Sequence, residues 1–272
     1  MPIANGGSHR LHYDVSGPSD APPVLLIMGF GLSSRGWSDL PARLAERFRV
    51  VVFDNRGIGQ STRPPGLFSM AHMADDAARV LDAANIERAH IFGISMGGMI
   101  AQEFALRHSR RAQSLALGCT HASWLRHHRP TVATIGALLG GMFVRTPASR
   151  MRLASVLVSA ELIEKEPQRF TDWVSRSEPA TAKMTALQMA AIVRHGTESR
   201  LPKLDVPTLV ITGAEDRLIP PENSRKLARL IPGAKLVELG ATGHCFPLER
   251  TDATVAELTR FFEASGRSTV RS

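Results

Sequence analysis

Residues 89–98 read AHIFGISMGG, and this stretch decides the fold. A short, continuous apolar run of this kind is typical of a strand that is buried on both faces of a sheet. The run ends at Ser95, which stands between Gly93 and Gly97 in the pattern G-x-S-x-G, and residues 97–109 then have the apolar spacing of a helix. The stretch therefore predicts a strand, a sharp turn that displays a serine hydroxyl, and a helix.

The alternation of apolar runs and helical patterns continues along the chain. Further strand-like runs occupy residues 9–16, 24–30, 48–55, 114–120, 208–215 and 234–240. Helical patterns occupy residues 69–85 and 222–231 and begin again near Thr251. Strands that alternate with helices are joined by crossover connections, which predicts an α/β fold with a mostly parallel sheet and helices on both faces.

One segment breaks this alternation. Residues 122–200 contain helix-like patterns but no convincing strand. We therefore predict a core formed by residues 1–121 and 201–272, and a helical cap (lid) insertion formed by residues 122–200. Its apolar run IGALLGGMFV at residues 135–144 fits two structures: a lid element that faces substrate or dips into a membrane, and an ordinary buried helix.

A displayed serine is a poor nucleophile unless a general base accepts its proton and a carboxylate orients that base. Asp216 follows one predicted strand and His244 follows the next, so both are expected at the same sheet edge as Ser95. Glu215 is adjacent to Asp216, and the pattern alone allows either carboxylate to face the histidine. His121 also follows a strand and is a weaker candidate for the base. Without these partners, Ser95 would be read as the N-cap of a helix after a glycine-rich turn.

Five stretches together resemble the α/β-hydrolase superfamily: LLIMGFG, FDNRGIGQS, GISMGG, ITGAEDRLIP and GATGHCFPLE. The resemblance covers almost the full length and is closest to bacterial esterases, methylesterase-like proteins and enol-lactonase-like proteins. It implies an α/β-hydrolase fold and a catalytic triad of Ser95, Asp216 and His244, because the family pattern G-x-x-D begins here at Gly213. Glu215 is then a solvated or capping carboxylate.

The resemblance also implies an oxyanion hole formed by two backbone N–H groups, those of Met96 and Phe30. Many relatives have His-Gly where this chain has Met28-Gly29. The usual histidine braces the loop, whereas a backbone donor does not depend on the side chain at position 28.

Several residues are candidates for contact with substrate, and their aromatic, methionine or glycine character is equally common in a protein core. They are Gly29, Trp37, Trp124, Met142, Phe143 and Phe246. Together they indicate a small to medium substrate that is partly apolar.

Composition narrows the classes of partner. The formal net charge is +8, but the basic residues are scattered and no nucleic-acid-binding pattern occurs, so we expect no nucleic-acid partner. The N-terminal residues lack the pattern of a signal peptide, and no apolar run is long enough to cross a membrane, so we expect a cytoplasmic protein without stable membrane insertion. The two cysteines do not form a disulfide framework. We expect no metal and no cofactor; a homo-oligomer is compatible with the sequence.

These patterns predict a serine hydrolase that cleaves a carboxylic ester or lactone of a small molecule through an acyl-enzyme on Ser95. Two alternatives remain at this point. The same triad can serve carbon–carbon bond hydrolysis or perhydrolysis, although His244 is followed by Cys245-Phe246-Pro247 rather than the tryptophan-containing sequence common in the carbon–carbon hydrolases. A ligand receptor that retained a hydrolase pocket is the other, because fold and site remnants do not guarantee turnover.

Overall fold

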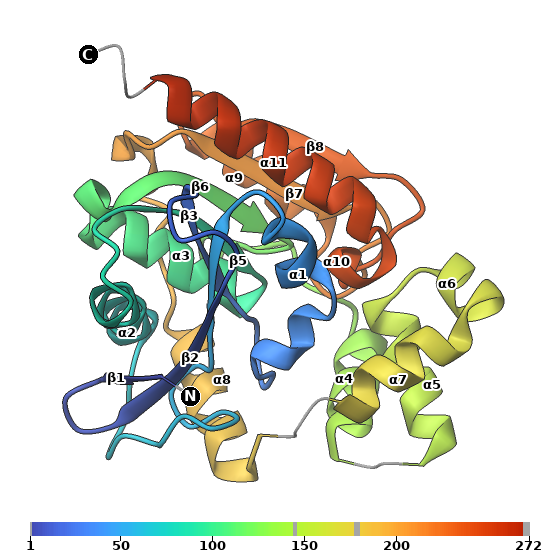
Figure 1. Cartoon of the computed structure of the whole chain (residues 1–272). Coiled ribbons are helices and arrows are strands. Elements are labelled where there is room, and N and C mark those ends of the chain that lie inside the picture. Colours follow the sequence, from blue (N-terminus) through green and yellow to red (C-terminus); the bar gives the residue numbers. More distant parts are fainter. Residues whose placement is uncertain (1, 144–145, 177–179, 269–272) are drawn as a thin grey trace.

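The computed structural model describes residues 2–143, 146–176 and 180–268. Its described residues form an eight-stranded sheet with the strand order β1-β2-β4-β3-β5-β6-β7-β8 (Figure 1). The strands are β1 (Ile3–Asn5), β2 (Arg10–Ser16), β3 (Pro23–Ile27), β4 (Arg49–Phe53), β5 (Ala89–Ile94), β6 (Ala112–Gly118), β7 (Thr208–Gly213) and β8 (Lys235–Leu239). The β1–β2 and β2–β4 pairs are antiparallel and every later pair is parallel. The expected mostly parallel sheet is confirmed.

All seven predicted runs contain a strand, but several strands are shorter than their apolar runs. β3 ends at Ile27 although its run continues to Phe30, because residues 28–30 leave the sheet as a loop. No sequence pattern predicted β1, a three-residue edge strand that forms a hairpin with β2. Residues 6–9 connect these two strands.

Helices cover both faces of the sheet, and each face has its own core (Figure 1). On one face pack α2 (Met70–Ala83), α3 (Met96–Arg107), α8 (Ala182–Val193) and α9 (Pro221–Leu230). On the other pack α1 (Leu40–Leu44), α10 (Phe246–Glu249) and α11 (Thr251–Ser268). Phe92 of β5 and Phe262 of α11 are both fully buried, and each side chain of this size contributes about 1.5–3 kcal/mol by its burial.

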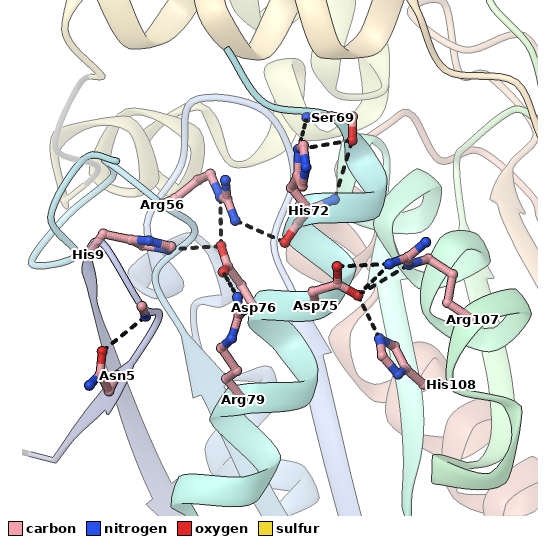
Figure 2. Close-up of polar contacts among 11 residues, drawn as sticks. Asn5, His9, Arg56, Ser69, His72, Asp75, Asp76, Arg79, Arg107 and His108 are labelled. Carbon is pink, nitrogen blue, oxygen red and sulfur yellow. Dashed lines mark hydrogen bonds and ion pairs between the residues drawn. The ribbon is translucent and has the colours of Figure 1, made fainter. Parts of the chain in front are cut away.

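A charged cluster fixes α2 against the N-terminal hairpin and the loop after β4 (Figure 2). Asp76 of α2 is 1% exposed, and its carboxylate contacts His9 Nε2 at 3.1 Å, Arg56 Nε at 2.6 Å and Arg79 Nη1 at 3.2 Å. A buried carboxylate is tolerated when it is paired in this way. The loop at residues 54–61 is therefore anchored by Arg56.

In the part of the chain that the structure describes, five α-helices lie between β6 and β7: α4 (Val132–Phe143), α5 (Pro147–Leu157), α6 (Ala160–Lys165), α7 (Pro167–Arg176) and α8. Helices α4 to α7 gather beside the sheet (Figure 1). Side chains of α5, α6 and α7 share a separate apolar cluster with Cys245 and Leu248, whereas α8 contributes Met184 and Ile192 to the core of the sheet. Among the described residues, no helix has both the length and the apolar character needed to cross a membrane.

Candidate active site

Ser95 occupies the turn between β5 and α3, at the middle of the sheet. Its backbone has φ 56° and ψ −121°, a conformation that residues with a side chain rarely adopt and that costs about 1–3 kcal/mol. The turn is held by hydrogen bonds from Ser95 N to Gly118 O at 2.8 Å and from Thr120 Oγ1 to Ser95 O at 2.8 Å. Ser95 is partly exposed between buried neighbours, so the strained turn displays this side chain.

The glycines around Ser95 are required by close contacts of the backbone. A Cβ atom at Gly97 would lie 2.0 Å from the carbonyl oxygen of Ile27, and one at Gly93 would lie 2.1 Å from the carbonyl oxygen of Gly97. Both distances are far below contact distance. The pattern G-x-S-x-G is therefore explained here by packing of α3 against β3 and β5.

Asp216 and His244 form a buried pair at the same edge of the sheet. His244 Nδ1 lies 2.8 Å from Asp216 Oδ2, and the two residues are 6% and 3% exposed. Asp216 Oδ1 accepts from the backbone N–H groups of Leu218 at 2.9 Å and Ile219 at 2.8 Å. Glu215 is exposed, so Asp216 is the carboxylate that faces the histidine. Because a carboxylate only accepts hydrogen bonds, Nδ1 is the donor in this pair, and in the neutral imidazole the lone pair is on Nε2.

The loop that carries His244 is anchored by Glu249 of α10. The Glu249 carboxylate accepts from Gly243 N at 2.8 Å and from Ser159 N at 2.8 Å, and burial raises the pKa of this carboxyl. Cys245 N also donates to Leu157 O at 2.8 Å. The histidine loop is thus attached to the turn between α5 and α6. Sequence reasoning missed Glu249, because its only signal was a carboxylate five residues after the histidine.

The Ser95 turn and the His244 segment both contact the end of β6. Gly118 accepts the hydrogen bond from Ser95 N, and a Cβ atom at Gly118 would lie 3.0 Å from Phe246 Cζ. β5, β6, β7 and β8 are neighbours in the sheet and run parallel, so their carboxyl ends share one edge. The predicted nucleophile, acid and base all follow strands at this edge.

Residues 28–31 form the loop that was expected to complete an oxyanion hole. A Cβ atom at Gly29 would lie 3.3 Å from Ser95 Cβ and 3.8 Å from Ser95 Oγ, so this loop lies directly against the serine. Met96 is the first residue of α3 and Phe30 follows Gly29. Asn55 Nδ2 donates to Met28 O at 2.9 Å, which braces the loop from the neighbouring β4 loop. The role of Asn55 in holding this loop was not predicted from the sequence. Its only signal was the place of Asn55 beside Asp54 in the stretch FDNRGIGQS.

The remaining predicted contact residues fall into different environments. Trp37 is 1% exposed and Phe246 is fully buried, and both flank Phe92, with ring centroids 5.2 and 6.3 Å from it. Trp124 is partly buried beside His127. The side chains of Met142 and Phe143 lie outside the described residues. Trp37 and Phe246 are thus brought together within the core of the sheet, and a role in substrate binding remains a prediction for all of them.

His121 is separate from the Asp216–His244 pair. Its ring stacks on His127 at 4.4 Å and lies 6.2 Å from His195, and it lines a small cavity with Arg126, Asn223 and Lys226. Burial is the main cause that lowers the pKa of His121 to about 3 and of His195 to about 4. Both imidazoles are therefore neutral over the physiological range.

Among the described residues, one cluster has the residue types of a metal site: ligand atoms of Cys119, Asp216 and His244 lie within 4.8 Å of one another. A metal needs the thiolate, whereas burial raises the pKa of the Cys119 thiol well above its usual value, and nearby Asp216 adds to this effect. Asp216 already accepts three hydrogen bonds. The cluster therefore fits an Asp–His pair beside a protonated thiol. Cys245 is buried as a free thiol whose pKa burial also raises.

The strained serine turn, the buried Asp–His pair and the mostly parallel sheet define a class of protein, the α/β hydrolases. A family model described as the alpha/beta hydrolase fold matches residues 22–251. The chain belongs to this family, and it is a hydrolase.

Comparison with individual proteins gives the same class. A protein of Azorhizobium caulinodans named "Putative carbamate hydrolase RutD" is 33% identical over 248 residues, which cover 90% of this chain and 92% of that protein. A protein of Mycobacterium tuberculosis named "Putative non-heme bromoperoxidase BpoC" is 29% identical over 259 residues, covering 93% and 97%. The crystal structure of an enol-lactonase from Burkholderia xenovorans LB400 superposes with a TM-score of 0.84 at 28% identity and covers 96% of this chain and 100% of that one.

Proposed function

We propose that the chain is a serine hydrolase that cleaves a carboxylic ester or lactone through an acyl-enzyme on Ser95. The observation that carries this proposal is the 2.8 Å hydrogen bond between His244 Nδ1 and Asp216 Oδ2, at the sheet edge where the Ser95 turn lies. A histidine whose Nδ1 is engaged by a carboxylate has Nε2 available as a general base. The helices between β6 and β7 act as a cap over this edge and select the acyl group.

In the first half of the reaction, Ser95 Oγ attacks the carbonyl carbon while His244 Nε2 accepts the hydroxyl proton. Negative charge develops on the carbonyl oxygen, and the backbone N–H groups of Met96 and Phe30 stabilise it. The position of Met96 at the start of α3 adds the positive end of the helix dipole. Collapse of the intermediate breaks the bond to the alcohol oxygen, which takes the proton from His244.

In the second half, water replaces the alcohol. His244 Nε2 accepts a proton from the water as its oxygen attacks the acyl carbon, and the same imidazole then returns that proton to Ser95 Oγ. Asp216 stays ionised throughout and stabilises the imidazolium. The net reaction consumes one water and releases an acid and an alcohol, or one hydroxy acid from a lactone.

Replacing Ser95 with Ala tests the proposal on a panel of p-nitrophenyl esters of increasing acyl length together with several lactones. We expect kcat to fall by about 10⁴-fold or more with the fold intact. Ser38 offers a matched control, because it is also partly exposed and has nearly the same backbone conformation, with φ 53° and ψ −128°. Ser38→Ala is expected to leave kcat unchanged. Undiminished turnover in Ser95→Ala would contradict the proposal.

Carbamate hydrolysis is a second candidate, because the 33% identical relative carries carbamate hydrolase in its name. A carbamate ester presents a carbonyl carbon to the same nucleophile. After attack by water, cleavage of the C–O bond gives an alcohol and a carbamic acid, and cleavage of the C–N bond gives an amine and a carbonic acid monoester. Measuring kcat/KM for a carbamate and for the ester of matched size decides between them. A ratio above one favours the carbamate, and a ratio below one favours the ester.

A further inference from the structure

Gln188 of α8 has a carboxamide that is only half satisfied. The residue is fully buried, and its Oε1 accepts a hydrogen bond from Gly31 N at 2.9 Å. Its Nε2 is buried and has no hydrogen-bond partner among the described residues. The orientation of the carboxamide is fixed, because a backbone N–H can only donate and so requires the oxygen at Gly31.

Gly31 lies one residue after Phe30, whose N–H is the second oxyanion donor in the proposed mechanism. Gly31 has φ 69°, in the left-handed region that glycine adopts without strain. The Gln188 bond gives the buried Gly31 N–H the partner that it would otherwise lack. Trp173 of α7 donates from Nε1 to Gly36 O at 2.8 Å. Two helices of the predicted cap thus hold the loop that follows β3.

The unpaired Nε2 is the second observation. Buried amide donors are nearly always paired, so an unpaired one in a native structure calls for a specific explanation. Nε2 shares its carboxamide group with the oxygen that holds Gly31, so this donor lies next to the loop that contacts Ser95. A donor in that place is suited to an acceptor oxygen of a bound substrate.

We propose that Gln188 is a positioning and specificity-determining residue: Oε1 aligns the oxyanion loop, and Nε2 donates to an acceptor oxygen near the scissile carbonyl of the substrate. This inference rests on the proposed function of Ser95. In this proposal Gln188, a residue of the predicted cap, holds the oxyanion loop in place. In many relatives a histidine at the position of Met28 has this role. It also names the substrate class, acyl compounds with an ether, hydroxyl, carbonyl or carbamate oxygen close to the reacting carbon.

Gln188→Met tests the alignment, because methionine keeps the size of the side chain and removes both polar atoms. We expect kcat to fall by about 10- to 100-fold, since a misplaced oxyanion donor weakens stabilisation of the transition state. Turnover is expressed per active serine, counted by titration with a fluorophosphonate. A kcat per active serine within twofold of the wild type would overturn the positioning role.

Gln102→Met is the matched control. Gln102 of α3 is also a fully buried glutamine, but both its polar atoms are paired, with His121 O at 3.1 Å and Thr197 Oγ1 at 2.6 Å. Its loss is expected to lower the melting temperature and to leave kcat per active serine unchanged. A structural role for Gln188 would give this same result, so the pair separates positioning from stability.

The Nε2 donor is tested on the wild-type enzyme first, and this test does not depend on any variant folding. p-Nitrophenyl methoxyacetate and butyrate have acyl groups of equal length, and 2-methoxyethyl and butyl esters form the same pair on the alcohol side. Each rate is divided by the rate of hydroxide hydrolysis, which removes intrinsic reactivity. We expect about a tenfold preference for the oxygen-containing member of one pair, equivalent to one hydrogen bond, and its loss in Gln188→Met.

No preference in either pair for the wild type, or a preference that Gln188→Met retains, would overturn the donor role. These failures differ from failure of the proposed function. If the proposed function fails, the wild type hydrolyses none of the esters, lactones or carbamates and is not labelled at Ser95. If only the role of Gln188 fails, the wild type is labelled and active, and only the effect of Gln188 is missing.

Discussion

The strand-end loops and the helices between β6 and β7 differ in how their positions are fixed. At the strand ends, Ser95 and Asp216 are held mainly by backbone hydrogen bonds to adjoining strands and turns. The helical segment is attached to these loops by individual side chains, among them Gln188, Trp173 and Glu249. The strand-end loops are therefore positioned by the backbone of the sheet, whereas the helical segment is joined to these loops through side chains that a substitution can remove.

The largest effect that separates the two regions is expected at the strand ends. Asp216→Asn keeps an oxygen for the N–H groups of Leu218 and Ile219 but presents an amide to His244, which favours the wrong imidazole tautomer. We expect kcat to fall by about 10⁴-fold, measured with the best ester of the panel. Glu215→Gln is the control, because Glu215 is exposed beside the same turn. Equal losses in both variants would contradict the assignment of the carboxylate.

A smaller effect is expected when a glycine of each region is replaced with alanine. Gly97→Ala forces a Cβ atom against the Ile27 carbonyl oxygen, so we expect the free energy of unfolding to fall by about 3 kcal/mol. Gly136 of α4 has no atom within 4 Å of its Cβ position. Gly136→Ala is expected to raise the same free energy by about 0.5–1 kcal/mol. Urea denaturation measures both, and a loss at Gly136 that equals the loss at Gly97 would remove the contrast.

A pH-dependent effect on stability is expected at three buried histidines. The pKa of His90 in β5 is lowered to about 4, mainly by burial, and His195 and His121, where the helical segment joins the sheet, have pKa values lowered to about 4 and about 3. Below pH about 6.5 the unfolded chain binds protons that these folded sites do not. Stability is therefore complete above this pH and is lost as the pH falls toward 4, by about 1.4 kcal/mol per pH unit for each site.

His90→Phe checks this linkage within the sheet. His90 stacks on Phe262 with ring centroids 4.7 Å apart, so phenylalanine keeps an aromatic ring at this position and removes one titrating group, together with the 2.8 Å hydrogen bond between Nδ1 and Ser114 Oγ. Chemical denaturation at several pH values between 4 and 6.5 gives the free energy of unfolding as a function of pH. In His90→Phe the slope of this function should be smaller by the contribution of one proton. His128→Phe, at an exposed position, should leave the slope unchanged. An unaltered slope in His90→Phe would contradict the linkage.

The difference between the strand-end loops and the helical segment also explains which features could be predicted from the sequence. The apolar runs and the serine turn were recognisable because local patterns determine parallel strands and tight turns. Asp216 and His244 were placed at the sheet edge because each follows a strand. The residue types alone allowed either Glu215 or Asp216, and the family pattern G-x-x-D selected Asp216, which is the buried carboxylate that contacts His244. Gln188 and Glu249 were missed because their contacts join residues that are 157 and 90 positions apart.

Labelling of Ser95 by a fluorophosphonate tests most directly whether His244 and Asp216 make its hydroxyl reactive. The expected result is one adduct per chain, located on Ser95 by peptide mass mapping, and a labelling rate that falls by about 10³-fold or more in folded His244→Ala. An adduct on another residue, no adduct at all, or an unchanged rate in His244→Ala would contradict the account.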